Sequence, residues 1–115
     1  IGVKRDDQLG PVLMYGMGGI FAEMAAEVTL RVCPISKQDA QDMVNEVAGS
    51  RTLIGSNGRP KADVDSLINT LVRVSELAVT LEGIIDEINI NPLIVLPRGQ
   101  GVKALEAVIT LSHQQ

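Results

Sequence analysis

Oxygen-bearing side chains recur at every second position near the end of the chain, at Glu87, Asn89 and Asn91. In a β-strand, this period of two places them on one face and the isoleucines between them on the other. Pro92 follows at once, and a proline that cannot donate to a ladder suits a strand edge or a bend. Amide and carboxylate oxygens are the ligands that Mg²⁺ and Ca²⁺ prefer. The segment is therefore predicted to be a strand that offers such oxygens.

A second strand, over residues 102–109, is predicted to return beside the first after a turn at residues 97–100. If Leu96 is paired with Gly101, Asn91 falls directly opposite Glu106. Opposed residues in an antiparallel pair have Cβ atoms about 5 Å apart, so the two side chains can share one cation. A shift of one residue in this register would send Glu106 to the other face.

The type and setting of Glu106 favour a bound cation, although plainer interpretations stay open. Glu106 stands between Leu105 and Ala107 in an otherwise apolar strand, where a carboxylate is costly unless it is paired or bound to a cation. The alternative is that the Asn91–Pro92 pair forms a turn and that Glu106 is an edge charge. The pattern alone gives these two interpretations about equal weight.

Glycines and arginines earlier in the chain are weaker candidates for binding an anion. The run Gly16-Met17-Gly18-Gly19 lets backbone N–H groups approach a phosphate, but it lacks the spacing of known phosphate-binding fingerprints. A bend between strands explains it as well. Arg31, Arg51 and Arg59 can bind phosphate or carboxylate, and solvated surface positions are the favoured explanation. His113 lies in a polar tail.

Composition limits the class of protein. The chain has 115 residues, 45% of them hydrophobic and 2% aromatic, so it forms a single domain, or part of one, with an aliphatic core. A net charge of −4 argues against a nucleic-acid partner. No apolar run approaches the roughly 20 residues of a membrane span, so no membrane is expected. The single cysteine, Cys33, permits no internal disulfide, which is typical of a reducing cytoplasm. Packing is the favoured explanation for it.

The elements that position these residues can be predicted from local patterns. Short strands are expected at residues 3–5 and 12–15, joined by a loop longer than two residues, and another over residues 28–32. Ser36 is expected to begin a helix, with Asp39 completing a capping box and Gly49 at its end. The start at Ile1, within strand-like sequence and without methionine, predicts a fragment of a longer protein.

The second helix carries the clearest periodicity in the chain. Asp63 is predicted to cap it and Gly83 to end it. Its apolar stripe comprises Val64, Leu67, Ile68, Leu71, Val72, Leu77, Ala78 and Leu81. The resulting order β-β-β-α-α-β-β predicts an α+β fold, a mostly antiparallel sheet with two helices packed on it.

An ordered set of motifs resembles a known family. The motifs are Gly10-Pro11-Val12-Leu13-Met14, Gly16-Met17-Gly18-Gly19-Ile20-Phe21-Ala22-Glu23, Arg31-Val32-Cys33-Pro34, Gly58-Arg59-Pro60 and Ile90-Asn91-Pro92-Leu93. Together they resemble the ATP-grasp domain of NDP-forming acyl-CoA synthetases, relatives of the succinyl-CoA synthetase β subunit. The match covers nearly the whole chain. It implies that residues 1–115 form one domain, the C-terminal fragment of an ATP-grasp domain.

The resemblance implies a reaction and its cofactors, Mg²⁺ and ATP or ADP. Such enzymes interconvert acyl-CoA, phosphate and a nucleoside diphosphate with free acid, CoA and the triphosphate. In the family, the Asn of the Asn-Pro-Leu motif and an acidic residue on the next strand hold the Mg²⁺, which here implies Asn91 and Glu106. That residue is often Asp in the succinyl relatives, so Glu106 departs from the pattern. Gly18 and Gly19 are expected near the nucleotide.

The resemblance also implies partners that this sequence lacks. The nucleotide lid, the CoA-binding domain and the phosphohistidine domain are expected on the rest of the same enzyme. We therefore assign no catalytic residue to this chain and expect it to be inactive alone. A homo-oligomer and an acetyltransferase domain on the same polypeptide stay open. The hypothesis from a different class is a non-catalytic α+β interaction or regulatory domain, in which the glycines are turns.

Overall fold

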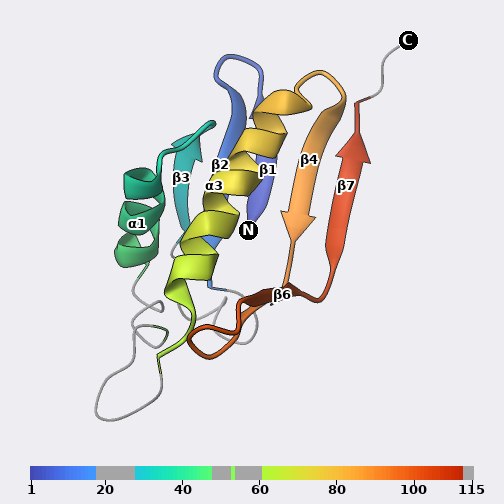
Figure 1. Cartoon of the computed structure of the whole chain (residues 1–115). Coiled ribbons are helices and arrows are strands. Elements are labelled where there is room, and N and C mark those ends of the chain that lie inside the picture. Colours follow the sequence, from blue (N-terminus) through green and yellow to red (C-terminus); the bar gives the residue numbers. More distant parts are fainter. Residues whose placement is uncertain (18–27, 48–52, 54–60, 113–115) are drawn as a thin grey trace.

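The computed structural model describes residues 1–17, 28–47, 53 and 61–112. Its elements follow the predicted order, with each of the last two predicted strands divided in two (Figure 1). They are β1 (Gly2–Asp6), β2 (Gly10–Gly16), β3 (Val28–Val32), α1 (Lys37–Glu46), α3 (Val64–Thr80), β4 (Ile85–Ile90), β5 (Leu93–Val95), β6 (Val102–Ala104) and β7 (Ala107–Leu111). No helix among the described residues is long and apolar enough to cross a membrane.

Five of the strands form one sheet, in the order β3-β2-β1-β4-β7, and every neighbouring pair is antiparallel. Strands β5 and β6 form a separate two-stranded hairpin. Figure 1 shows α3 crossing in front of β1 and β2, with α1 beside β3 and β7 at the edge of the sheet away from both helices. The predicted α+β class, with two helices on a mostly antiparallel sheet, is confirmed.

The loop between β1 and β2 explains why the chain reverses there. One carboxylate oxygen of Asp6 accepts hydrogen bonds from the backbone N–H groups of Gln8 and Leu9, at 2.8 and 2.9 Å. Gly10 then adopts φ +80°, a conformation that residues with a Cβ rarely take. A turn closed by a residue in the left-handed region is typical of loops longer than two residues, as predicted here.

Helix α1 begins as predicted. Ser36 is its N-cap, accepting a hydrogen bond from the backbone N–H of Asp39, and the Asp39 carboxylate accepts one from the N–H of Ser36 in return. This reciprocal pair satisfies two of the amide groups that a helix leaves free at its start. The helix ends at Glu46, and the predicted cap Gly49 lies outside the described residues.

Helix α3 differs from its predicted stripe in one respect. Leu77, counted on the buried face, is 43% exposed, whereas Val74 and Ser75 are buried. Ser75 is tolerated there because its hydroxyl accepts from the N–H of Ile35 at 3.1 Å and donates to the carbonyl of Val72 at 2.7 Å. Gly83, at φ +90°, lies in the turn after the helix, because Leu81 is the C-cap.

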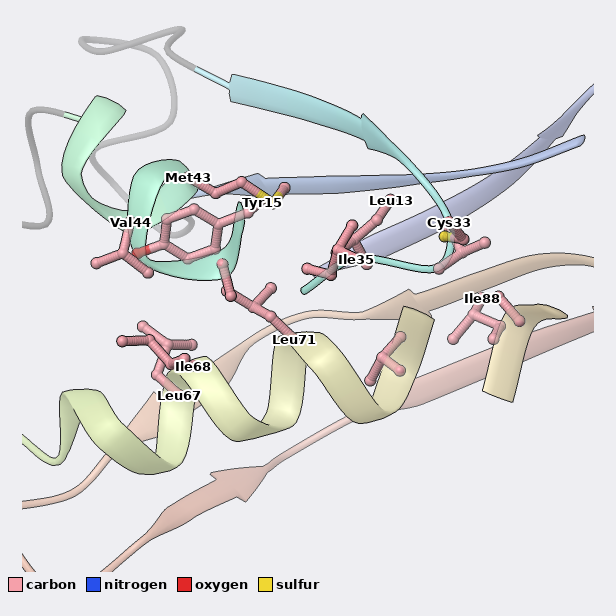
Figure 2. Close-up of a cluster of buried hydrophobic side chains, with 14 of the residues drawn as sticks. Leu13, Tyr15, Cys33, Ile35, Met43, Val44, Leu67, Ile68, Leu71 and Ile88 are labelled. Atoms are coloured by element: carbon pink, nitrogen blue, oxygen red, sulfur yellow. The ribbon is translucent and has the colours of Figure 1, made fainter. Parts of the chain in front are cut away.

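The core lies between the helices and the sheet face that they cover (Figure 2). Leu13 from the sheet, Met43 from α1 and Leu71 from α3 are all fully buried there. Cys33 is buried at the edge of this cluster, and desolvation raises the pKa of its thiol to about 11. Such a thiol is almost wholly protonated at neutral pH, so the packing interpretation of Cys33 agrees with its environment.

Candidate metal site

The same pairing offset applies in the five-stranded sheet and in the β5–β6 hairpin, although the ladder itself is interrupted between them at Asn91–Pro92 and Leu105–Glu106. In the sheet, Asn89 is opposite Val108 and Ile90 is opposite Ala107. At the next step the N–H of Asn91 donates to the carbonyl of Glu106 at 3.1 Å. The predicted pairing of Asn91 with Glu106 is thereby confirmed.

Further along the chain, the same register continues through the hairpin to its turn. The N–H of Leu105 donates to the carbonyl of Pro92, and the N–H of Leu96 donates to the carbonyl of Gly101, each at 3.0 Å. The second of these bonds confirms the predicted pairing of Leu96 with Gly101. The backbone therefore fixes which residues face one another over the whole length of this arm.

The returning strand is not continuous, in contrast to the prediction. It is divided into β6 and β7, which belong to different sheets, and Leu105 and Glu106 lie between them. The division falls opposite Pro92, whose missing N–H removes a ladder hydrogen bond at that point. Pro92 was predicted to suit a strand edge or a bend, and it lies where both strands pass from one sheet to the other.

The environment of Glu106 also differs from the expectation. Glu106 is exposed, and so is every residue of β7 that follows it. The argument that an apolar strand would bury this carboxylate and demand a partner is therefore wrong. The case for a cation now depends on the opposition of Asn91 and Glu106.

The predicted alternation of faces along β4 is confirmed. Ile88 is 3% exposed and belongs to the core, whereas Glu87, Asn89 and Asn91 are exposed on the face away from the helices. An open cleft of about 570 Å³ lies along this part of the molecule. Its described lining combines polar residues, Lys4, Glu87, Asn89 and Asn91, with apolar ones that include the core residues Val3, Tyr15, Leu67 and Ile88, and Glu106 is not part of it.

Lys4 belongs to the cleft but was not singled out from the sequence. It is opposite Glu87 in the pairing of β1 with β4, and both side chains are exposed. The alternation of Val3, Lys4 and Arg5 contained the necessary signal, because the buried Val3 requires its neighbours to face away. A positive side chain therefore lies in the same cleft as the polar row of β4.

Of the other anion-binding candidates, Arg31 is paired within the chain and the rest lie outside the described residues. Arg31 is on the helix side, where its guanidinium forms an ion pair with Glu46 of α1 and donates to the hydroxyl of Thr29 at 2.9 Å. These contacts occupy its guanidinium within this chain, whereas a solvated surface position was favoured from the sequence. Gly18, Gly19, Arg51, Arg59 and His113 lie outside the described residues, although Gly16 and Met17, which lead toward the two glycines, line the cleft.

The donor set at Asn91 and Glu106 fits Mg²⁺ shared with a nucleotide. Among the described residues, no three or more His, Cys, Asp or Glu side chains gather into a group that would hold a metal by protein ligands alone. Mg²⁺ is instead commonly held by one or two protein oxygens, with phosphates and water completing its octahedron. One amide oxygen and one carboxylate, exposed at the bend between two sheets, match that requirement.

Comparisons with known proteins identify relatives of this chain. The β subunit of ADP-forming acetate–CoA ligase II from Pyrococcus furiosus is 38% identical over 111 residues, covering 96% of this chain and 47% of the relative. ADP-forming acetate–CoA ligase I from Archaeoglobus fulgidus is 38% identical over 109 residues, covering 95% of this chain and 16% of the relative. The chain thus spans less than half the length of these two relatives.

Solved structures share the fold. A crystal structure from Pyrococcus horikoshii has a TM-score of 0.91 and 35% identity, covering 98% of this chain and 47% of that one. Acetyl-coenzyme A synthetase 1 of Candidatus Korarchaeum cryptofilum, in complex with coenzyme A and Mg-AMPPCP, has a TM-score of 0.86 and 38% identity, covering 96% and 51%. The ATP-grasp domain family matches residues 1–111. The chain belongs to the ATP-grasp domain family.

Proposed function

We propose that this chain is the C-terminal part of the ATP-grasp domain of an ADP-forming acyl-CoA synthetase. The whole enzyme would interconvert acyl-CoA, ADP and phosphate with free acid, CoA and ATP. The two ligases above support this reaction, and the Korarchaeum structure contains coenzyme A and a magnesium–nucleotide analogue. CoA-binding and phosphohistidine domains are the partners that such an enzyme requires, and we propose a cytoplasmic location for it.

The observation that carries the proposal is the opposition of Asn91 and Glu106 in a register fixed by backbone hydrogen bonds. The amide oxygen of Asn91 and the carboxylate of Glu106 would hold Mg²⁺. When bound, the ion neutralises charge on the nucleotide phosphates, which is a general requirement of phosphoryl transfer. The protein's part is to keep its two ligands in place before the nucleotide arrives.

The proposal predicts that the 115-residue chain alone has no turnover. Phosphoryl transfer needs a clamp on the nucleotide as well as a positioned metal. The part described here supplies a cleft and one pair of ligands. Formation of ATP from acyl-CoA, ADP and phosphate by the isolated chain would contradict this division of labour.

The direct test uses the full-length protein that carries this chain, with Asn91→Ala or Glu106→Ala. Each change removes one proposed ligand, so the Mg²⁺ concentration for half-maximal activity should rise by at least about 10-fold, since even outer-shell changes cost that much. Glu76→Gln is the matched control, because it removes a carboxylate from the exposed side of α3. Unchanged Mg²⁺ dependence in both ligand variants would refute the metal assignment.

A further inference from the structure

The carboxylate of Asp63 joins two elements that are far apart in sequence. One oxygen accepts a hydrogen bond from the N–H of Ser66 at 3.1 Å and so caps α3. The other accepts from the N–H of Gly101 at 2.7 Å, in the β5–β6 hairpin. Asp63 is only 7% exposed. Capping a helix needs one acceptor, so the second bond is a feature that capping does not explain.

The contact closes a ring of three backbone segments at the tip of the hairpin. The N–H of Asp63 donates to the carbonyl of Leu96 at 2.7 Å, and the N–H of Leu96 donates to the carbonyl of Gly101 at 3.0 Å. Gly101 then donates back to the Asp63 side chain. Nearby, the N–H of Arg98 donates to the carbonyl of Lys61 at 2.8 Å. The start of α3 therefore fixes both strands of the hairpin at their turn.

The hairpin needs such support because it is short. Each of its strands has three residues, and an isolated two-stranded hairpin is marginally stable in water. Leu93, Val95 and Val102 pack one side of it against the core, while Ile94 is 39% exposed on the other. Packing holds one side of the hairpin, and the Asp63 ring holds its tip.

The base of this hairpin carries the proposed magnesium ligands. Asn91 lies five residues before Leu96, on the far side of the bend at Pro92 that separates β4 from β5. The β5–β6 ladder reaches Leu93 and Ala104, and single backbone hydrogen bonds, from Leu105 to Pro92 and from Asn91 to Glu106, continue the pairing to the base. We propose that Asp63 is a positioning residue for the magnesium site, which orients Asn91 and Glu106 by fixing the hairpin against α3. The effect on magnesium binding rests on the proposed function, whereas the attachment of the hairpin to α3 through Asp63 rests on the described contacts alone.

The electrostatics of Asp63 agree with this role. The N–H groups of Gly101 and Ser66 lower the pKa of its carboxyl group, so the group is ionised at neutral pH and accepts through both oxygens. An asparagine at this position retains one acceptor oxygen and replaces the other with an NH₂ group that cannot accept. Asp63→Asn can therefore retain the cap or the hairpin bond, but not both.

The test compares Asp63→Asn with Ser36→Ala in the full-length protein. Ser36→Ala removes the cap of α1, which does not contact the hairpin through any described hydrogen bond. The first measurement is amide hydrogen exchange at Gly101, Leu105 and Asn91 without nucleotide or metal. The second is the affinity for Mg²⁺–AMPPCP, measured by calorimetry.

Asp63→Asn should accelerate exchange at all three amides and weaken Mg²⁺–AMPPCP binding by about 10-fold, as expected for a partner that orients metal ligands. Ser36→Ala should change neither quantity, although it lowers the melting temperature. Asp63→Ala leaves no acceptor and so removes the hairpin bond whichever bond Asp63→Asn retains, and unchanged exchange at Leu105 and Asn91 in Asp63→Ala would overturn the positioning role. So would faster exchange with unchanged affinity. Failure of the proposed function is distinguishable, because then Asn91→Ala itself would leave Mg²⁺–AMPPCP affinity unchanged.

Discussion

The two ends of the sheet are held by different forces. Around β2, the helices bury Leu13 and Leu71 completely, and packing determines the structure. Around β7, all five residues are exposed, Leu111 by 61%, and the strand is held by its ladder to β4. The proposed metal ligands belong to the second region. Stability and the proposed chemistry therefore depend on different interactions, and mutations should separate them.

The largest effect on stability is expected from Leu71→Ala. The side chain is fully buried, and truncation of a core leucine costs about 2–5 kcal/mol, because it loses contacts and leaves a cavity. Leu111→Ala makes the same chemical change at an exposed edge and should cost no more than about 0.5 kcal/mol. Urea unfolding of the two variants, followed by circular dichroism, measures the difference.

A large cost for Leu111→Ala would show that another surface covers β7 in the full-length protein. The comparison of the two regions would then apply to this chain alone. A small cost for Leu71→Ala would contradict the account of the core, because nothing else in α3 fills the same volume.

The next effect concerns chemistry at the hairpin base. Glu106→Gln keeps the size of the side chain and removes its charge, so the Mg²⁺ concentration for half-maximal activity should rise by about 10-fold or more. Glu106→Asp keeps the charge on a shorter stem and should lose less. Neither change should alter the free energy of unfolding by more than about 0.5 kcal/mol, since the side chain is exposed. Equal losses in both variants would argue that Glu106 acts through its length and not its charge.

Glycines in two turns offer a smaller and more local comparison. Gly10, between β1 and β2, and Gly99, in the turn of the β5–β6 hairpin, have φ of +80° and +84°. Alanine at either position should cost about 1–2 kcal/mol for adopting the left-handed region. Gly10→Ala should lower the global free energy of unfolding, because β1 and β2 carry the core residues Val3 and Leu13.

Gly99→Ala should act mainly on the hairpin, which can open without unfolding the core. We therefore expect faster hydrogen exchange at Gly101 and a higher Mg²⁺ concentration for half-maximal activity. The change in the urea midpoint should be smaller than for Gly10→Ala. Equal shifts of the midpoint in both variants would show that the hairpin and the core unfold together.

The sequence predicted the fold well where the signal was local and periodic. The Ser36–Asp39 box and the Asp63 cap depend on residues three apart, and both form as expected. The register of Asn91 with Glu106 was also correct, because a short turn leaves few ways to pair the two strands. Burial was harder. Glu106 was assigned to an apolar strand that proved to be exposed, since periodicity reveals faces but not what covers them.

The role of Asp63 was only half visible in the sequence for a related reason. Its cap depends on Ser66, three residues away. Its bond to Gly101 joins residues 38 positions apart, and no local sequence pattern predicts it. For Lys4, the alternation with Val3 indicated the face on which it lies, but only the pairing of β1 with β4 places it opposite Glu87. Residues that act through tertiary contacts of this kind require the structure.

The smallest effect is expected at the ion pair of Arg31 and Glu46, which ties β3 to α1 on the helix side. The guanidinium and the hydroxyl of Thr29 both donate to the Glu46 carboxylate, and they lower its pKa. A carboxyl group with a lowered pKa in the folded state stabilises the protein above its unfolded pKa, about 4.3. This contribution is lost as the pH falls through the lower, folded value.

Glu46→Gln should therefore be slightly less stable than wild type at pH 7, by a difference that shrinks in acid. Both side chains are partly exposed, 30% for Arg31 and 47% for Glu46, so solvent screening keeps the effect small. Asp39 also carries a lowered pKa, which makes acid destabilise both proteins, so only their difference at each pH is informative. Urea unfolding at pH 7 and near pH 3 measures it. A difference that persists undiminished in acid would show that Glu46 acts by packing and not by charge. Packing would then hold the contact between β3 and α1, as it already holds the core of the helix-covered end of the sheet.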